Sequence, residues 1–255
     1  MMKHIQGQRM NKKIELITFD LDDTLWDNMP TIRKAEIDTR KWIEDKVGRI
    51  EWGDFDDFLN LREELIIEDE SIAWDISKLR KEIFRKKLIH IEPESYRNEL
   101  VDKAFEIFIQ KRHKVEFYDG VEESIEQLSQ KYTLGILTNG NADIFKFKIG
   151  KFFDFSISSL EAKDSKPNRS HFDQALKKIN SSNYSDMLHI GDHQINDVFG
   201  AFNLGIEALW FNNTNAVWSQ SFKKPDEFDS WYKFCLLYTS PSPRDTDKSR
   251  MPSSA

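Results

Sequence analysis

The sequence predicts an α/β fold in which the chain of a parallel sheet is interrupted by an all-helical insertion. Between residues 133 and 211, short apolar β-prone runs alternate with helical patterns, and this alternation is typical of a parallel sheet covered by helices on both faces. Residues 14–19 (IELITF) form a further apolar run that leads into an acidic turn. Because a short strand is not stable alone, we expect it to join the later strands in one sheet.

The expected elements of the second half follow one another in a regular order after Tyr118-Asp119-Gly120. Helices need apolar residues three or four positions apart, and strands need short β-branched or aromatic runs bounded by turn residues. On these criteria we expect helices over residues 121–130, 170–180 and 196–203, and strands over residues 133–137, 155–158, 187–190 and 206–211.

The segment between residues 31 and 114 predicts helix. It is highly charged, contains few Gly or Pro, and carries apolar stripes at helical spacing. The clearest stripes are Val101, Ala104, Phe105, Phe108 and Ile109, and Ile72, Ile76, Leu79 and Ile83. About four helices fit, with breaks near residues 48–54, 68–71 and 91–93. We expect them to lie over the carboxyl ends of the strands, where open α/β sheets bind ligands.

Composition and charge favour a small polar ligand over a macromolecular or membrane partner. The chain has 255 residues and a net charge of −7, which argues against general binding to nucleic acids or anionic membranes because both need a basic surface. No apolar run approaches the ~20 residues that a membrane helix requires. Residues 1–13 are basic, but the apolar run that follows is short, unlike a secretory signal. A cytoplasmic location is therefore expected.

The last segment, residues 235–255 (CLLYTSPSPRDTDKSRMPSSA), breaks the preceding pattern. Its Ser- and Pro-rich composition is typical of a disordered tail, but it also resembles a translated sequencing-library adapter. We interpret it as adapter sequence, so the native protein is expected to end near Phe234 and the segment is set aside from fold reasoning. Cys235 is the single cysteine of the chain, which excludes an internal disulfide and a cysteine-rich metal site.

An acidic pentapeptide, Asp20-Leu21-Asp22-Asp23-Thr24, directly follows the first expected strand. In extended geometry Asp20 and Asp22 share one side of the chain, and a turn can spread both carboxylates around one substrate. Taken alone, such a pentapeptide is more often an acidic turn or a helix cap. Its position relative to other polar segments is what favours a functional interpretation.

Three further polar segments follow later expected strands. They contain Thr138-Asn139, Lys166, and Asp192 with Asn196-Asp197. Individually they have ordinary interpretations, as turn residues, a solvated charge and helix N-terminal acids. Because the carboxyl ends of parallel strands meet in one crevice, we expect these segments to meet the acidic pentapeptide. A hydroxyl with adjacent backbone N–H groups, an ammonium group and paired acids together suit a phosphate and a divalent cation.

These segments, FDLDDT, LTNG, SKP and GDHQINDV, resemble in the correct order the four motifs of the haloacid dehalogenase-like superfamily. The helical insertion resembles the cap of the subfamily whose cap lies between the first and second motifs. The resemblance implies a Rossmann-like parallel-sheet core built from residues 12–26 and 116–234. It also implies an inserted all-helical cap domain over residues 27–115.

The resemblance further implies a role for each residue that matches a motif. Asp20 is the implied nucleophile, and Asp22 is the implied general acid and base. Thr138, Asn139 and Lys166 are the implied phosphate-binding residues. Proton transfer by a positioned side chain such as Asp22 typically contributes ~10²–10⁴-fold to a rate.

The implied cofactor is Mg²⁺, held by Asp20, Asp192 and the backbone carbonyl of Asp22. Hard oxygen ligands of this kind select Mg²⁺ over softer metals. Thr24 and Asp197 are implied to support the site from behind these ligands, Asp197 by orienting the lysine or a metal-bound water. His193 fills a variable position of the motif, and we expect it to be a neighbour of the site rather than a catalytic base.

The implied reaction is Mg²⁺-dependent hydrolysis of a small phosphorylated metabolite through an aspartyl-phosphate intermediate. Asp22 separates this chain from the dehalogenases of the superfamily, which carry no acid at that position. A phosphomutase would keep the same acids, and a binding or regulatory protein would keep the fold without turnover. The runs TFDLDDTLWDN, TNGNAD and EALWFN resemble flavin-pathway and related sugar-phosphate phosphatases, which suggests a riboflavin precursor or FMN as substrate. The oligomeric state is left open.

Overall fold

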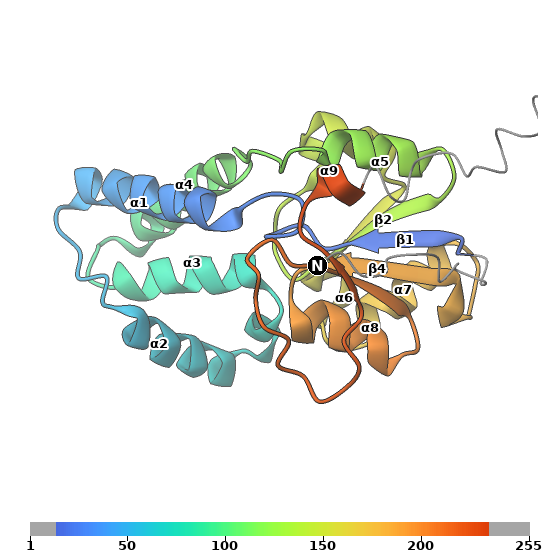
Figure 1. The fold of residues 1–255 in the computed structure, drawn as a ribbon. Coiled ribbons are helices and arrows are strands. Elements are labelled where there is room, and N and C mark those ends of the chain that lie inside the picture. Colours follow the sequence, from blue (N-terminus) through green and yellow to red (C-terminus); the bar gives the residue numbers. More distant parts are fainter. Residues whose placement is uncertain (1–13, 235–255) are drawn as a thin grey trace, which may run out of the picture.

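The computed structural model describes residues 14–234. The segment interpreted as adapter sequence, residues 235–255, lies outside the described residues, as do residues 12 and 13 at the expected start of the core. Within the described part, the chain forms a sheet flanked by helices and an all-helical layer beside it (Figure 1).

The sheet of the described chain has six strands, all parallel, in the order β3-β2-β1-β4-β5-β6. The strands are β1 (Leu16–Phe19), β2 (Thr133–Thr138), β3 (Phe155–Ser158), β4 (Met187–Gly191), β5 (Glu207–Phe211) and β6 (Asp226–Phe228). The first strand lies between β2 and β4 and is buried along its whole length. The predicted α/β class is confirmed, and the short N-terminal run joins the later strands as expected.

Alternation along the strands gives the sheet two apolar faces. Ile17 and Phe19 of β1 contribute to one core, whereas Leu16 contributes to the other. Helices lie on both sides of the sheet and cover these two faces (Figure 1). The first face packs against α5 (Val121–Ser129), η3 (Lys148–Phe152) and α9 (Trp231–Phe234), and the second against α6 (Ser159–Ala162), α7 (Ser170–Lys178) and α8 (Gly200–Asn203).

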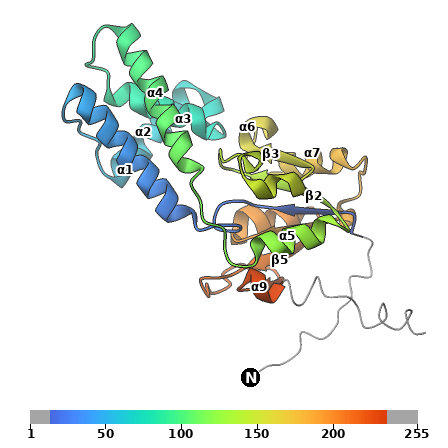
Figure 2. The ribbon, with the colours of Figure 1, turned by 90° about the horizontal axis from the view of Figure 1, so that it is seen from above.

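The helical layer follows β1 and precedes α5. It consists of α1 (Asn28–Val47), α2 (Phe55–Glu68), the 3₁₀ turn η1 (Glu70–Ala73), α3 (Ile76–Lys87) and α4 (Glu94–Arg112). The first and last of these helices run along each other and lead to the sheet side by side (Figure 2). The expected stripe on α4 buries Val101, Ala104 and Phe108, whereas Ile76 is 40% exposed because it begins α3. Each helix of the described chain is too short or too polar to cross a membrane.

The fold differs from the sequence prediction in the segments that follow β4 and β5, among others. The expected helix over residues 196–203 begins earlier, as a π-helical turn η5 (Gln194–Phe199) that continues into α8. His193 caps this turn, because its Nδ1 accepts the N–H groups of Ile195 and Asn196 at 3.1 and 3.0 Å. The strand β6 and the helix α9 were not predicted, since three and four residues are too few to show a period.

Helix α9 closes the first face of the sheet near the loop that follows β1. Trp231 is buried and packs against the rings of Phe19, Phe211 and Phe228. Its indole N–H donates a hydrogen bond to the carbonyl oxygen of Thr24 at 2.8 Å. The end of the described chain thereby anchors the loop that carries the acidic pentapeptide.

Trp231→Ala is expected to lower the free energy of unfolding by about 3–5 kcal/mol, because it leaves an aromatic-sized cavity and removes the hydrogen bond to Thr24. Urea denaturation followed by circular dichroism measures this change. Tyr232→Ala is the control, since Tyr232 is 63% exposed and its loss should change stability by no more than about 0.5 kcal/mol. Equal losses in the two variants would contradict the packing of α9.

Candidate active site

The strand register brings the segments after β1, β2 and β4 to one edge of the sheet. Phe19 pairs with Ile136 on one side and with Ile190 on the other, so the residues that follow these positions lie side by side. They border a cavity of about 170 Å³ lined by Asp20, Asp22, Asp23, Thr138, Asn139, Gly140, Lys166, Asp192, His193, Asn196 and Asp197. Of the site residues predicted from the sequence, Thr24 alone is outside this lining.

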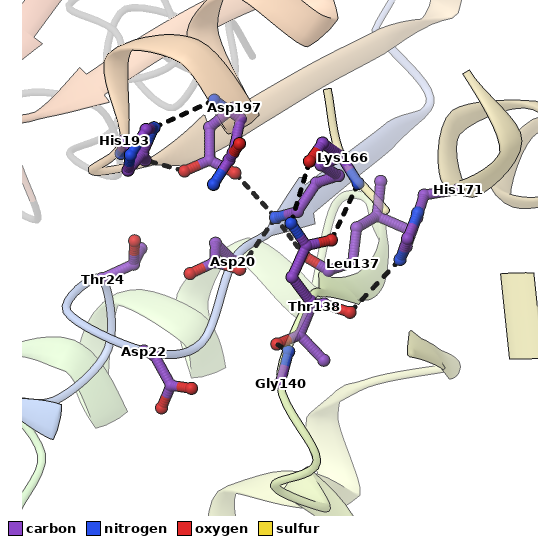
Figure 3. A network of polar contacts seen from close by, with 12 residues as sticks. Asp20, Asp22, Thr24, Leu137, Thr138, Gly140, Lys166, His171, His193 and Asp197 are labelled. Carbon is purple, nitrogen blue, oxygen red and sulfur yellow. Dashed lines mark hydrogen bonds and ion pairs between the residues drawn. The ribbon is translucent and has the colours of Figure 1, made fainter. Parts of the chain in front are cut away.

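Lys166 is the centre of the polar contacts (Figure 3). Its buried ammonium group donates to Asp20 Oδ1 at 2.8 Å, to Asp197 Oδ1 at 2.6 Å and to the carbonyl oxygen of Leu137 at 2.5 Å. Burial disfavours the charged ammonium, but the carboxylates of Asp197 and Asp20 outweigh it and raise the pKa of Lys166. Lys166 therefore stays charged and joins the ends of β1 and β2 to η5.

Asp197 faces Lys166 with both of its oxygens engaged. Oδ1 accepts from the lysine and lies 3.2 Å from Nε2 of His189, and Oδ2 accepts the N–H of His193 at 3.0 Å. Gly191 permits this close approach, because a Cβ there would lie 2.3 Å from Asp197 Cγ. Burial opposes its ionisation, but Lys166 and His189 lower the pKa of Asp197. The residue is therefore a carboxylate aimed at the lysine.

Asp20, Asp192 and Asp197 form a compact acidic group, whose nearest carboxylate oxygens all lie within 4.8 Å of one another. Burial and the neighbouring acids raise the pKa of Asp20 to about 7, although Lys166 opposes this shift. Burial and the carboxylates of Asp197, Asp20 and Asp23 raise the pKa of Asp192 to about 8, against a hydrogen bond of 3.1 Å from the hydroxyl of Thr24. These shifts indicate negative charge that the protein alone does not compensate, and a divalent cation among oxygen ligands would compensate it.

The end of β2 supplies the hydroxyl and amide groups of the site. Thr138 Oγ1 accepts the N–H of Gly140 at 2.9 Å. The side chain of Asn139 holds the backbone of Lys166, since Oδ1 accepts its N–H at 2.8 Å and Nδ2 donates to its carbonyl oxygen at 2.9 Å. A phosphate contact from Asn139 would therefore come from its backbone N–H rather than from its side chain.

Asp22 points away from Asp20 and Lys166 (Figure 3). A turn with Asp23 at a φ of 59° spreads the two carboxylates. Nη2 of Arg112 donates to both oxygens of Asp22, at 2.6 Å to Oδ2, and the indole N–H of Trp26 donates to Oδ1 at 3.0 Å. Asp22 thus lines the cavity, while its carboxylate is held by the last residue of α4.

Sequence reasoning missed two charged or titratable residues of the site, Arg112 and His189. Arg112 ends a long charged helix, where a cation usually lies in solvent, and no local pattern links it to Asp22, 90 positions away. His189 carried a signal that could have been used. It occupies the register position opposite Thr18, and its Nδ1 lies 2.9 Å from the Thr18 hydroxyl. Two polar residues at matching positions of central strands are unusual in an apolar core.

A protein-family model and several known phosphatases match most of this chain. The sequence model of the family of haloacid dehalogenase-like hydrolases matches residues 14–205. The 5-amino-6-(5-phospho-D-ribitylamino)uracil phosphatase YigB of Escherichia coli (strain K12) is 27% identical over 204 residues, which cover 80% of this chain and 85% of the relative. The glyceraldehyde 3-phosphate phosphatase of Pyrococcus furiosus is 27% identical over 210 residues, which cover 78% of this chain and 81% of the relative.

Solved structures show the same fold. The crystal structure of a 2-haloacid dehalogenase from Pseudomonas syringae pv. Tomato DC3000 is similar at a TM-score of 0.81 and 31% sequence identity, covering 88% of this chain and 97% of that chain. The crystal structure of a HAD phosphatase from Thermococcus onnurineus is similar at a TM-score of 0.58 and 21% identity, covering 89% and 99% of the two chains. Because the family model spans strands β1 to β4 and every polar segment of the cavity, the chain belongs to the haloacid dehalogenase-like hydrolases.

Proposed function

We propose that this chain is a Mg²⁺-dependent phosphatase that hydrolyses a small phosphorylated metabolite through an aspartyl-phosphate on Asp20. The observation that carries the proposal is the 2.8 Å contact between Lys166 and Asp20, in a cavity that also contains Thr138 and Asp192. Ammonium, hydroxyl and carboxylate groups in one cavity match the needs of phosphoryl transfer, which depends on positioning and charge stabilisation. The two curated relatives described above are both named phosphatases.

Asp20 is the proposed nucleophile. One of its carboxylate oxygens forms a bond to phosphorus while the bond between phosphorus and the alcohol oxygen breaks. Lys166 orients Asp20 and, with Thr138, stabilises the negative charge of the transferring phosphoryl group. Mg²⁺, when bound, would screen the repulsion between the carboxylates and the phosphate.

Asp22 is the proposed general acid and base. Its proton goes to the departing alcohol oxygen, and the resulting carboxylate then takes a proton from the water that attacks the aspartyl-phosphate. This second step releases inorganic phosphate and restores the Asp20 carboxylate. The roles of the two acids agree with their surroundings, because Asp20 faces Lys166 whereas Asp22 faces the helical layer.

The residues present fit a Mg²⁺ ion. Asp20 and Asp192 would hold it through side-chain oxygens, together with the backbone carbonyl of Asp22. The raised pKa values of Asp20 and Asp192 support this assignment, since burial and the neighbouring acids outweigh the effect of Lys166 on Asp20, and the ion would supply further positive charge to both acids. Asp197 lies in the same acidic group, but both of its oxygens already accept hydrogen bonds, which supports its role in orienting Lys166.

A phosphorylated ribityl compound of the flavin pathway is the proposed substrate, with FMN as a related candidate. The resemblance of three sequence runs and the 27% identity to YigB support this choice. Glyceraldehyde 3-phosphate is the competing candidate, because a phosphatase for it is equally identical to this chain. The helical layer, residues 27–115, is proposed to act as the cap that selects among such substrates. Phosphate release measured over a panel of both classes distinguishes them.

Dehalogenation is a second candidate function, favoured by the 31% identity to the protein from Pseudomonas syringae that is described as a 2-haloacid dehalogenase. The acid at position 22 argues against it, because displacement of a halide requires no proton donor to the leaving group. Chloride release from 2-chloropropionate tests this candidate. A phosphomutase would instead transfer phosphate between two positions of one sugar, which product analysis detects.

Asp20→Asn is expected to lower phosphatase activity by at least about 10³-fold, because it removes the nucleophile. Hydrolysis of p-nitrophenyl phosphate with Mg²⁺ present measures this loss. Asp226→Asn is the matched control, since Asp226 is exposed on β6 and should leave activity unchanged. Activity of the Asp20→Asn variant equal to that of the wild type would refute the proposed mechanism.

Asp22→Asn is expected to affect substrates according to their leaving group. For an alkyl phosphate, whose alkoxide needs a proton, kcat/KM should fall about 10²-fold. For p-nitrophenyl phosphate, whose phenolate leaves without protonation, kcat/KM should fall less than about 5-fold. Steady-state kinetics on both esters measures the ratio. Equal losses on the two esters would show that Asp22 is not the general acid.

Mg²⁺ is expected to raise the melting temperature more at about pH 8.5 than at about pH 6. In the metal-free protein the pKa values of Asp20 and Asp192 lie at about 7 and about 8, above their unfolded values. Between the ordinary value of 3.8 and these raised values the folded protein holds protons that the unfolded chain has released, so the stability of the metal-free protein falls as the pH rises toward about 8. Thermal melts with and without MgCl₂ test this. Asp192→Asn should remove most of the shift, and an equal shift at both pH values would contradict the assignment.

A further inference from the structure

Arg112, the last residue of α4, is bound to the catalytic machinery across the boundary between the helical layer and the sheet. Its side chain is 1% exposed, and Nη2 donates to both carboxylate oxygens of Asp22. Its guanidinium carbon also lies 6.0 Å from the ring of Trp26, which donates to the same carboxylate. Arg112 and Trp26 therefore determine together where the Asp22 carboxylate points.

The contacts of Arg112 differ from those of a buried structural arginine on the same helix. Arg97 donates to the carbonyl oxygens of Ile89 and Ile91, both at 3.1 Å, and thereby holds the turn before α4. The hydrogen bonds of Arg112 within residues 14–234 all go to Asp22, and its Nε and Nη1 are buried with no hydrogen-bond partner there. A purely structural arginine would use these donors, because unpaired buried donors are costly.

The backbone around Asp22 makes the contact sensitive to the position of α4. Two linkers join the helical layer to the sheet, and they lie side by side. Trp26 and Phe117 form an isolated antiparallel β-bridge between them, and the N–H of Tyr118 donates to the carbonyl oxygen of Leu25 at 3.0 Å. Arg112 immediately precedes the returning linker, whereas Asp22 precedes the outgoing one. A shift of α4 relative to β1 therefore moves the guanidinium with respect to the carboxylate.

Gly140, which follows β2, leaves room for the ion pair between Asp22 and Arg112. A Cβ on Gly140 would lie 2.7 Å from Asp22 Oδ2 and 3.7 Å from Arg112 Nη2. A side chain at this position would therefore displace the carboxylate from the guanidinium. The absence of a Cβ at residue 140 lets three segments of the chain meet at one ion pair.

We propose that Arg112 is a positioning residue that aims the general acid Asp22 and couples its placement to the helical layer. This inference rests on the proposed function, because it assigns Arg112 a role through Asp22. Arg112 acts on the step in which the departing alcohol is protonated. It does not act on the attack by Asp20, which Lys166 orients from the opposite side of the cavity.

The test is the leaving-group dependence of Arg112→Gln and Arg112→Lys in the full chain with Mg²⁺. Arg112→Gln should lower kcat/KM for an alkyl phosphate about 10-fold or more, and for p-nitrophenyl phosphate less than about 3-fold. Arg112→Lys keeps the charge but loses the planar fork of donors, so its loss on the alkyl phosphate should be smaller. Combined with Asp22→Asn, Arg112→Gln should cause no further loss on the alkyl phosphate, because both changes remove one function.

Two variants on the same helix serve as controls. Lys111→Gln breaks a partly exposed ion pair with Asp38 and should leave both substrates unaffected. Arg97→Gln should lower the melting temperature without any leaving-group dependence, which shows how a structural arginine behaves. Melting temperatures of all variants are recorded, and Arg112→Lys provides the kinetic answer if Arg112→Gln is too unstable to purify.

Equal losses of kcat/KM on the two substrates in Arg112→Lys, or multiplicative losses with Asp22→Asn, would overturn the inference. These results differ from a failure of the proposed function. If the wild type releases no phosphate, or if Asp20→Asn stays fully active, the proposed function fails and Arg112 has no such role. If the wild type and Asp22→Asn behave as expected and the Arg112 variants do not, the inference alone fails.

Discussion

The buried ammonium group of Lys166 is the constraint on which this edge of the sheet depends. A charge that leaves water must be compensated by hydrogen bonds and opposite charge. Three separate segments provide this compensation: Asp20 after β1, Leu137 in β2 and Asp197 in η5. Because each segment must reach the same nitrogen, their positions are determined together. The close approach of η5 to Gly191 is one consequence.

The charge balance around the lysine explains why the cavity suits a cation and a phosphate. The negative charge of Asp197 is already neutralised by Lys166, and its carboxylate also contacts the buried ring of His189. Lys166 offsets the charge of Asp20 only in part, and burial together with the neighbouring acids makes ionisation of both Asp20 and Asp192 costly. A divalent cation relieves this cost, and the cation in turn favours an anionic ligand beside it. The acids and the lysine are thus parts of one electrostatic arrangement.

The two proposed catalytic acids are held by different parts of the molecule. Asp20 is oriented from the sheet through Lys166, whereas Asp22 is oriented from the helical layer through Arg112 and Trp26. The turn at Asp23 makes this division possible, since it directs neighbouring side chains to opposite sides of the cavity. The nucleophile is therefore placed by contacts at the edge of the sheet, and the acid by the contact between the sheet and the helical layer.

The parallel α/β sheet, the helical insertion and the four polar segments of the cavity could be predicted from the sequence, because hydrophobic period and strand-end position are local properties. The sequence also indicated the motif residues Asp20, Asp22, Thr138, Lys166 and Asp192. Three contacts could be seen only in the folded chain: Arg112 pairs with Asp22, Asn139 holds the backbone of Lys166, and Trp231 of α9 anchors Thr24. These contacts join segments far apart in the chain. Their partners are chosen by burial and unsatisfied hydrogen bonding, which no periodic pattern records.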